Sequence, residues 1–203
     1  MHNCIDFPNN RNNTTNYIFM SKLRVTPKQH KAAIDRLKDR RKNEPWQEDN
    51  RKLDNAIRDY TTHLNKCGYG ASVIDVGCGR QYLKRCLPDG VLYLGIDAFP
   101  AEGYEDITTT LAIEEDFAKM YEAETVVAFA VLDNCRDFDK AIENMKEVAT
   151  RNVIILTGIG IDPDQYHTMR LELSDFDSRF EGWENTVREE ISPKVWLLNF
   201  VKP

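Results

Sequence analysis

The sequence lacks the features that mark membrane-spanning and secreted proteins. No stretch approaches the run of about 18 apolar residues that a membrane-spanning helix needs, so we expect no membrane span. The first 20 residues are rich in asparagine and lack the apolar core and cleavage site of a signal peptide. We therefore expect residues 1–20 to form a flexible tail, with Met20 as a candidate alternative start.

Cysteine is scarce and unpaired in pattern. The chain has five cysteines, an odd number, and none of them forms a C-x-x-C pair. This pattern argues against both a disulfide framework and a zinc site, and it favours free thiols in a reducing cytoplasm.

Charge is divided unevenly between the two parts of the chain. Residues 1–52 carry a net charge of +6, whereas residues 53–203 carry −12. The basic segment "KQHKAAIDRLKDRRK" has two interpretations, a solvated helix face or a surface that contacts nucleic acid or a phosphorylated substrate. Aromatic residues are not interleaved with the basic ones, which gives the nucleic-acid interpretation no support beyond charge.

From Ser72 onward, short apolar runs alternate with amphipathic segments. Strands are predicted at 72–76, 91–96, 125–132 and 152–158, and helical patterns lie near 81–87, 111–122 and 136–149. The strands are apolar throughout, as in parallel strands covered on both faces, so we predict a doubly wound, mostly parallel α/β sheet. Two further extended runs, about 183–190 and 195–201, are joined closely enough to form a C-terminal antiparallel hairpin.

Helices are predicted before the sheet. Pro27 is a candidate first residue of a helix that reaches about Lys42. A second helix has Leu53, Ile57, Tyr60 and Leu64 at helical spacing and ends at "NKCGYG". We accordingly divide the chain into the tail 1–20, an N-terminal helical segment 21–66 and an α/β domain 67–203.

The stretch "SVIDVGCGRQYL" (72–83) combines a strand, an acid and two glycines. Asp75 lies at the end of the strand, and Gly77 and Gly79 fall in the turn that follows, where a missing Cβ lets a ligand approach the backbone. The N–H groups of the predicted next helix would point at the same place. Asp97 ends the second strand, 22 residues after Asp75, where an acid can accept the hydroxyls of a ribose.

The same stretch excludes the commonest nucleotide ligands. Tyr82 stands where a dinucleotide fingerprint has its third glycine, which disfavours NAD and FAD, and no G-K-[ST] of a P-loop occurs. A carboxylate before the glycines would repel a phosphate, but it suits the positive amino group of an amino acid.

These motifs resemble those of class I S-adenosylmethionine-dependent methyltransferases. "VIDVGCGRQYL" resembles the first motif, D-x-G-x-G-x-G, with Gln81 at the usual third glycine, and "YLGIDAFP" resembles the acidic second motif. "TVVAFAVLDNCRDFDKAIENMKEVA" resembles the fourth strand and its helix, "EVATRNVIILTG" the fifth-strand region, and the closing hairpin the reversed last strand. The resemblance covers about residues 53–203 and implies a Rossmann-like fold with S-adenosylmethionine as cofactor.

The resemblance also implies roles for individual residues. The methionine end of the cofactor would lie against the glycine loop, the ribose on the acid of the second motif, and the adenine between the residues that follow it and the third strand. The methyl group would face the end of the fourth strand. Asp75, Gly77, Cys78 and Gly79 would thus lie against the methionine end, and Asp97 against the ribose. Ala98 and Phe99, with Asp106 or Ile107 after the third strand, would lie against the adenine. Val131 to Asp133 would face the methyl group.

Asp133 and His167 are the candidate catalytic residues, as general base or substrate contacts. Residues 133–136 read Asp-Asn-Cys-Arg rather than [DN]-P-P-[YF], which argues against methylation of nucleobase amino groups. We expect a small-molecule acceptor, while a macromolecule presented to the basic N-terminal helices stays open. One alternative is a catalytically silent S-adenosylmethionine-binding or interaction module. Gln81 favours it, as do Glu124-Thr125 in place of the acid that often opens the family's fourth strand and "VLDN" where many members read like "VLEH". A nicotinamide-dependent oxidoreductase is the less favoured alternative.

Overall fold

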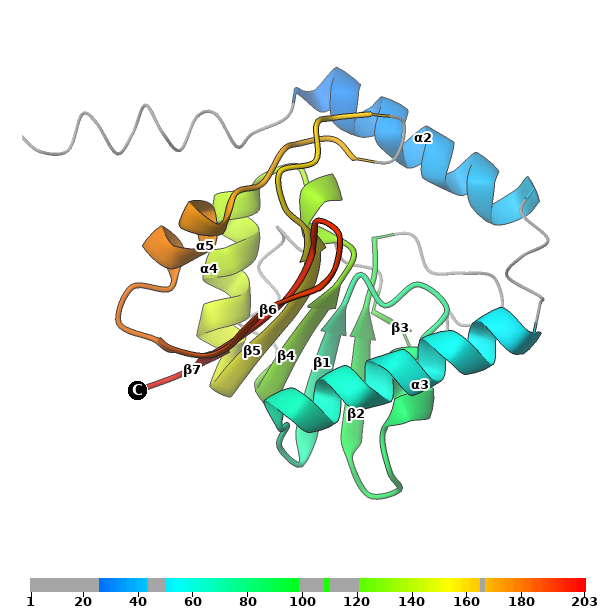
Figure 1. Cartoon of the computed structure of the whole chain (residues 1–203). Helices are drawn as coiled ribbons and strands as arrows, with labels where there is room; N and C mark the ends of the chain where they lie inside the picture. The colour runs from blue at the N-terminus through cyan, green and yellow to red at the C-terminus, as the bar shows by residue number, and fades with distance from the viewer. Residues whose placement is uncertain (1–25, 44–49, 99–107, 110–120, 165–166) are drawn as a thin grey trace, which may run out of the picture.

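A seven-stranded sheet forms the centre of the protein (Figure 1). The computed structural model describes residues 26–43, 50–98, 108–109, 121–164 and 167–203. The strand order is β3-β2-β1-β4-β5-β7-β6. Strand β7 pairs antiparallel with both β5 and β6, and the other neighbouring strands pair parallel. The strands are β1 (Ser72–Val76), β2 (Leu92–Ile96), β3 (Thr108–Thr109), β4 (Ala123–Phe129), β5 (Ala149–Gly158), β6 (Glu184–Ser192) and β7 (Val195–Val201).

Helices cover both faces of this sheet (Figure 1). Helix α3 (Asn50–Cys67) lies on one face, and α4 (Phe138–Val148) and α5 (Leu173–Arg179) lie on the other. Helix α2 (Pro27–Asn43) lies on the side of the molecule toward which the parallel strands point. The doubly wound, mostly parallel fold predicted from the sequence is therefore confirmed.

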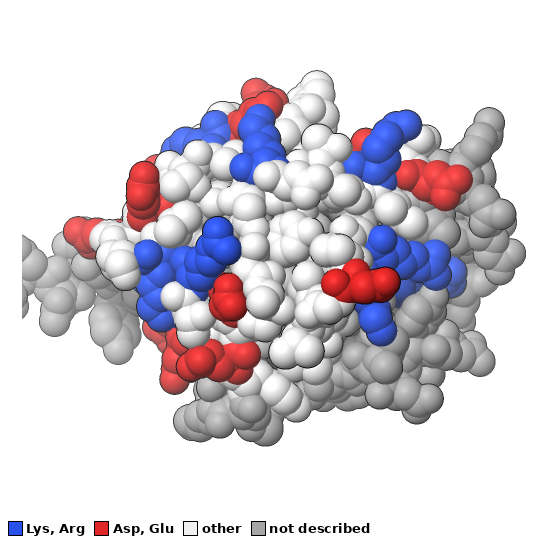
Figure 2. Space-filling model, turned by 90° about the horizontal axis from the view of Figure 1, so that it is seen from below, with Lys and Arg blue, Asp and Glu red and all other residues white. Residues whose placement is uncertain are grey.

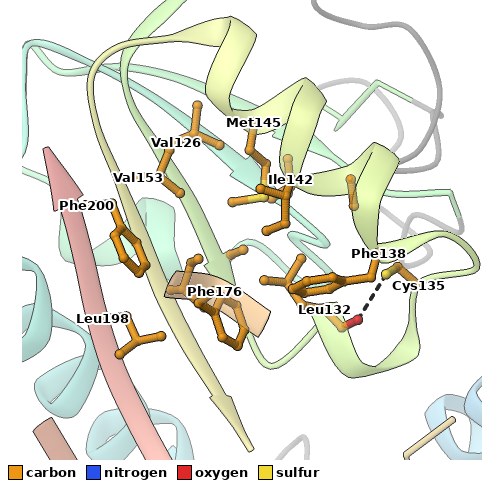
Figure 3. Packing of buried hydrophobic residues seen from close by; sticks show 14 of the residues in the cluster. Val126, Leu132, Cys135, Phe138, Ile142, Met145, Val153, Phe176, Leu198 and Phe200 are labelled. Carbon is orange, nitrogen blue, oxygen red and sulfur yellow. Dashed lines mark hydrogen bonds between the residues drawn. The ribbon is translucent and has the colours of Figure 1, made fainter. Parts of the chain in front are cut away.

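The core has two layers because successive side chains of a strand point to opposite faces. On β1, Val73 packs in the layer under α3, and Ile74 packs in the layer under α4. The larger layer contains Phe138 and Met145 of α4 and Phe176 of α5, packed against β4, β5 and β7 (Figure 3). The continuous apolarity of the strands in the sequence reflects this double burial.

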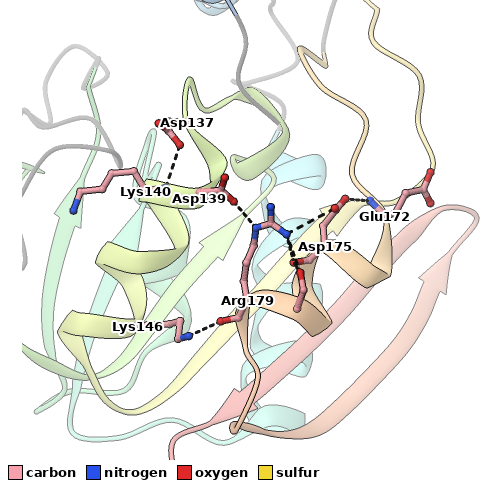
Figure 4. A network of polar contacts seen from close by, with 8 residues as sticks. Asp137, Asp139, Lys140, Lys146, Glu172, Asp175 and Arg179 are labelled. Atoms are coloured by element: carbon pink, nitrogen blue, oxygen red, sulfur yellow. Dashed lines mark hydrogen bonds and ion pairs between the residues drawn. The ribbon is translucent and has the colours of Figure 1, made fainter. Parts of the chain in front are cut away.

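Ionic contacts join α4 to α5 on the covered face (Figure 4). The guanidinium of Arg179 donates to the Asp139 carboxylate and to the backbone carbonyl of Asp175. Asp139 and Asp175 are both buried. Lys146 of α4 donates to the carbonyl of Arg179. At the start of α4, Asp137 caps the helix by accepting from the Lys140 N–H, 3.2 Å away.

The C-terminal hairpin is also confirmed. Strands β6 and β7 pair antiparallel through a tight turn in which Lys194 has φ 63°. Strand β7 inserts between β5 and β6, so it is buried along most of its length, while β6 forms the edge and alternates between exposed and half-buried residues.

Two local predictions differ from the structure. The segment 81–87 is not an α-helix but a short 3₁₀ turn, η3 (Leu83–Cys86), because Pro88 follows too soon for an α-helix to develop. The expectation that an α-helix N-terminus points at the glycine loop is therefore wrong. The resemblance implied a third strand before Asp106, but the apolar pattern did not locate β3, since two residues carry no periodic signal. Most of the predicted helix at 111–122 lies outside the described residues.

Several properties of the described part of the chain bear on the sequence predictions. Its four cysteines are free thiols, and none of its helices is long and apolar enough to cross a membrane. On the face seen in Figure 2, basic and acidic side chains are interspersed rather than gathered by sign.

Candidate functional site

The candidate site lies at the carboxyl ends of three neighbouring strands. Val76, the last residue of β1, is in register with Ile96 of β2 on one side and with Ala128 of β4 on the other. The chain leaves β1 toward β2 and later returns to β4 on the opposite side, so the strand order reverses here. In open α/β sheets, ligands bind at such a reversal, beyond the carboxyl ends of the strands.

The loop after β1 makes a tight turn through three left-handed residues. Gly77 has φ 72°, Gly79 has φ 51° and Gln81 has φ 56°. The Gly77 N–H donates to the Ile96 carbonyl at 2.7 Å, and the Gln81 N–H donates to the Cys78 carbonyl at 2.7 Å. Gln81 thus adopts the conformation that a glycine would take there, at a cost of roughly 1–2 kcal/mol for a residue with a Cβ.

Asp75 is buried at the end of β1, with only 4% of its surface exposed. The hydroxyl of Tyr93 donates to its Oδ2 at 2.8 Å. Burial raises the pKa of Asp75 to about 7; the Tyr93 hydrogen bond lowers it, and the nearby charge of Asp97 adds to the increase. A buried carboxylate with one short side-chain hydrogen bond and a negative neighbour favours binding of a cation.

Asp97, the residue after β2, contacts the glycine loop directly. Its Oδ2 accepts from the Gly79 N–H at 2.9 Å, and the residue is buried. Ala98 follows at the same edge and is half-buried. Phe99, Asp106 and Ile107 lie outside the described residues, and the last two precede β3 in the chain rather than follow the third strand as expected.

Gly77 and Val131 are in direct contact, although 54 residues separate them in the sequence. A Cβ on Gly77 would lie 2.4 Å from Cγ2 of Val131. The space left by this glycine is therefore filled by the protein itself, which joins the loop after β1 to the loop after β4. We expected the missing Cβ to let a ligand approach the backbone, and here it serves packing as well.

The side chain of Cys78 packs inward rather than along the edge of the sheet. It is buried, and its Sγ lies 2.7 Å from the position that a Cβ on Gly95 would occupy. Its thiol therefore packs against β2, while its N–H donates to the Ile96 carbonyl at 3.2 Å and its carbonyl accepts from the Gln81 N–H at 2.7 Å.

Asp133 and His167 lie together, 34 residues apart in the sequence. Asp133 belongs to the 3₁₀ turn η6 (Leu132–Asn134) after β4, and its Oδ2 is 3.5 Å from Nε2 of His167. The backbone brings them together because the Asp133 carbonyl accepts from the N–H and hydroxyl of Thr168, at 3.1 and 2.7 Å, and from the Met169 N–H at 3.2 Å. The ring of His167 is held at the carboxyl end of β4.

Burial raises the pKa of Asp133, while the neighbouring His167 acts in the opposite direction. A histidine beside a carboxyl group can exchange a proton with a bound compound. Within the residues that the structure describes, no group of three or more His, Cys, Asp or Glu side chains is arranged to hold a metal ion.

The structure adds two residues that the sequence analysis did not single out. Tyr93 binds Asp75 across the parallel register of β1 and β2, a pairing that no local pattern indicates. Asp164 accepts from the backbone N–H of His167 at 2.8 Å and lies 2.9 Å from its Nδ1. The D-x-x-H spacing is a signal that would have found Asp164, because an aspartate commonly accepts from backbone N–H groups a few residues ahead.

No protein-family model matches the sequence, and no curated protein matches it. Solved structures do match the fold. Magnesium protoporphyrin IX methyltransferase from Synechocystis PCC 6803 with bound SAM has a TM-score of 0.56 at 16% identity, covering 96% of this chain and 100% of that one.

Two further structures agree with the first. The 1,6-didemethyltoxoflavin-N1-methyltransferase from Burkholderia thailandensis, bound to its substrate and S-adenosylhomocysteine, has a TM-score of 0.61 at 11% identity, covering 88% of this chain and 91% of that one. The N-methyltransferase NodS from Bradyrhizobium japonicum WM9 with S-adenosylhomocysteine has a TM-score of 0.58 at 16% identity, covering 79% and 93%. The chain therefore has the class I methyltransferase fold, as the sequence motifs indicated.

Proposed function

We propose that this protein is an S-adenosylmethionine-dependent methyltransferase that acts on a small molecule. The observation that carries the proposal is the buried Asp75 carboxylate beside the left-handed loop that contains Gly77 and Gly79, with the Asp97 carboxylate against the same loop. Two carboxylates beside a loop with two glycines suit a ligand that has an ammonium group and a ribose. S-adenosylmethionine has both.

The residues fit this ligand from one end to the other. Asp75 is suited to the amino group of the methionine moiety, which would lie along the loop from Gly77 to Gly79, whose three N–H groups donate within the protein. Asp97, and Ala98 after it, are suited to the ribose and the adenine, and Val131 would lie near the methyl group. The structural neighbours support the assignment, since three of their structures contain SAM or S-adenosylhomocysteine.

The protein's own groups must orient the acceptor and manage its proton. Bound S-adenosylmethionine supplies an activated methyl group, so the chain needs neither a metal nor a nucleophile of its own. Asp133 and His167, at the end of β4, are placed to hold an acceptor and to remove a proton from it. Small-molecule acceptors are named for two of the neighbours, a protoporphyrin and a toxoflavin precursor, which supports a small acceptor here.

Calorimetry tests the donor site directly. Titration with S-adenosylmethionine and with S-adenosylhomocysteine should show one site, whereas NAD should give no heat of binding. The Asp97→Ala variant should bind about 1–3 kcal/mol more weakly, since charge-assisted hydrogen bonds are lost. Asp97→Asn keeps an acceptor for the Gly79 N–H and should lose less. Asp89→Ala, an exposed carboxylate before β2, is the matched control.

Absence of binding by the wild-type protein would overturn the proposal, and unchanged affinity in Asp97→Ala would remove the ribose assignment. Binding without turnover on any acceptor of a broad small-molecule panel would favour the silent binding module instead.

A further inference from the structure

His167 is held between two carboxylates at the acceptor end of the site. Its Nδ1 lies 2.9 Å from Oδ1 of Asp164, and its Nε2 lies 3.5 Å from Oδ2 of Asp133. The ring is partly exposed, with 26% of its side-chain surface accessible, while the side chain of Asp133 is 8% exposed. The ring is therefore accessible from solvent, and the carboxylate behind it is almost completely buried.

The buried carboxylate of Asp133 has a backbone N–H as hydrogen-bond donor, but side-chain donors lie at the limit of hydrogen-bond distance. Within the described residues its two side-chain contacts are Nε2 of His167 and Nδ2 of Asn134, each at 3.5 Å. Charge-assisted hydrogen bonds are normally about 2.7–2.9 Å long. In addition, Oδ1 of Asn134 is buried and has no hydrogen-bond partner in the described part of the chain. In the described part of the chain, Asp133 thus lacks a close side-chain donor and Oδ1 of Asn134 lacks any donor, whereas buried acceptors normally have close donors.

The charges on the segment from Asp162 to Glu172 also favour a positively charged acceptor. Arg170, the cation that follows this segment, is held by Asp162 at 2.7 Å and by Glu172 at 2.6 Å. Its charge is balanced by those two carboxylates and is not directed at Asp133. An anionic acceptor would meet Asp133 and Asp164 without a free cation on this segment, whereas a positive donor-bearing group would be attracted.

We propose, on the basis of the methyltransferase function inferred above, that the acceptor is a basic amine and that the methylated atom is its nitrogen. Asp133 and Oδ1 of Asn134 accept hydrogen bonds from the ammonium group and draw it to the end of β4. His167 receives a proton from the nitrogen at Nε2. Asp164 is a positioning residue, which holds Nδ1 so that Nε2 faces Asp133 and the substrate.

The proton and electron balance of this step is simple. The ammonium first loses a proton, which leaves a nitrogen lone pair. That lone pair forms the new N–C bond to the sulfonium donor's methyl group, and the electrons of the broken C–S bond return to sulfur. The nitrogen, now positive, loses one further N–H proton unless the product leaves as a cation. Sulfur ends as a neutral thioether, and no oxidant or reductant is needed.

Matched probe pairs test the charge preference without knowledge of the natural acceptor. The wild-type protein, saturated with S-adenosylhomocysteine, is titrated in ligand-observed NMR with tryptamine and indole-3-acetate, and with benzylamine and benzoate. We expect the amines to bind at least tenfold more tightly than the acids of similar shape. Asp133→Asn should weaken amine binding at least tenfold and leave the affinity for S-adenosylhomocysteine unchanged, while Asp89→Asn should change neither.

Kinetics with the best amine separates positioning from binding. Asp164→Asn should lower kcat at least tenfold with little change in KM, since the amine contacts Asp133 rather than Asp164. His167→Gln should lose turnover but retain amine binding.

Binding of S-adenosylhomocysteine with no preference for the amines, or with a preference for the acids, would overturn this inference and leave the methyltransferase proposal intact. Failure of S-adenosylhomocysteine itself to bind would overturn both. The comparison of amines with acids uses only the wild-type protein, so it does not depend on the folding of any variant.

Discussion

Replacing Asp75 with asparagine should make the protein more stable and a weaker binder of the methyl donor. Asp75 is 4% exposed, and burial raises its pKa from 3.8 to about 7. The carboxyl is protonated in both the folded and the unfolded chain below pH 3.8, so it has no effect on stability there. Between pH 3.8 and about 7 the unfolded chain releases the proton while the folded chain keeps it, and stability falls as the pH rises.

The size of this effect follows from the pKa difference. About three pKa units correspond to about 4 kcal/mol above pH 7, with each unit worth 1.36 kcal/mol. Asparagine has nearly the same shape and can still accept from the Tyr93 hydroxyl, but it carries no charge. Its amide has its own desolvation cost, about 1–3 kcal/mol, which does not vary with pH. The pH-dependent part of the comparison therefore isolates the carboxylate.

Urea unfolding at pH 4.5 and pH 8.5 measures this part. The free energy of unfolding of Asp75→Asn, relative to wild type, should increase by about 3 kcal/mol between the two pH values, which is 2.5 pKa units at 1.36 kcal/mol each. Glu143→Gln, an exposed carboxylate on α4, is the control and should show no such increase. A difference that stays constant with pH would refute the reasoning, because it would mean that folding does not raise the pKa of Asp75. In calorimetry at pH 8.5, the same variant should bind S-adenosylmethionine at least tenfold more weakly.

Three further substitutions test the packing that supports the site. Gly77→Ala should lower the free energy of unfolding by about 2–4 kcal/mol, from its positive φ and the overlap with Val131, and Val131→Ala in the same chain should recover part of the loss in urea unfolding. Arg179→Met should lower the free energy of unfolding by about 3–5 kcal/mol, because the buried Asp139 carboxylate loses its partner. Adding Asp139→Asn should restore stability, whereas additive losses in the double variant would contradict a pairwise role. Asn152→Leu removes three side-chain hydrogen bonds that join Asn152 to β4, β7 and the turn after α3. Thermal unfolding should therefore show a loss of at least about 3 kcal/mol in the free energy of unfolding. A neutral result would show that this polar network is dispensable.

Much of the fold could be predicted from the sequence because its signals are local. Strand β1 was predicted with its observed bounds, since the apolar run 72–76 stands between Ala71 and Gly77. Gly68, with φ 71°, ends α3 as expected, and its N–H donates to the Leu64 carbonyl at 2.8 Å. Turn residues and side-chain periods act within a few residues, so a single sequence carries them.

The predictions that failed concern short segments. Seven residues at 81–87 matched a helical pattern, but a helix this short has little stability of its own. Pro88 ends the segment early, and η3 packs against α3, with the Cys86 thiol 3.4 Å from the Ile57 carbonyl. Strand β3 has two residues and exists only through its pairing with β2.

The sequence by itself determined which chemical groups stand at the strand ends: an acid at the end of β1 with glycines after it, an acid after β2, and Asp133 after β4. The tertiary structure decided what those groups touch. It placed the Tyr93 hydroxyl on Asp75, filled the space beside Gly77 with Val131, and brought His167 to Asp133. The reason is physical, since the pKa of a carboxyl group depends on its solvation and neighbouring charges, and those are set by residues far away in the chain that only folding brings near.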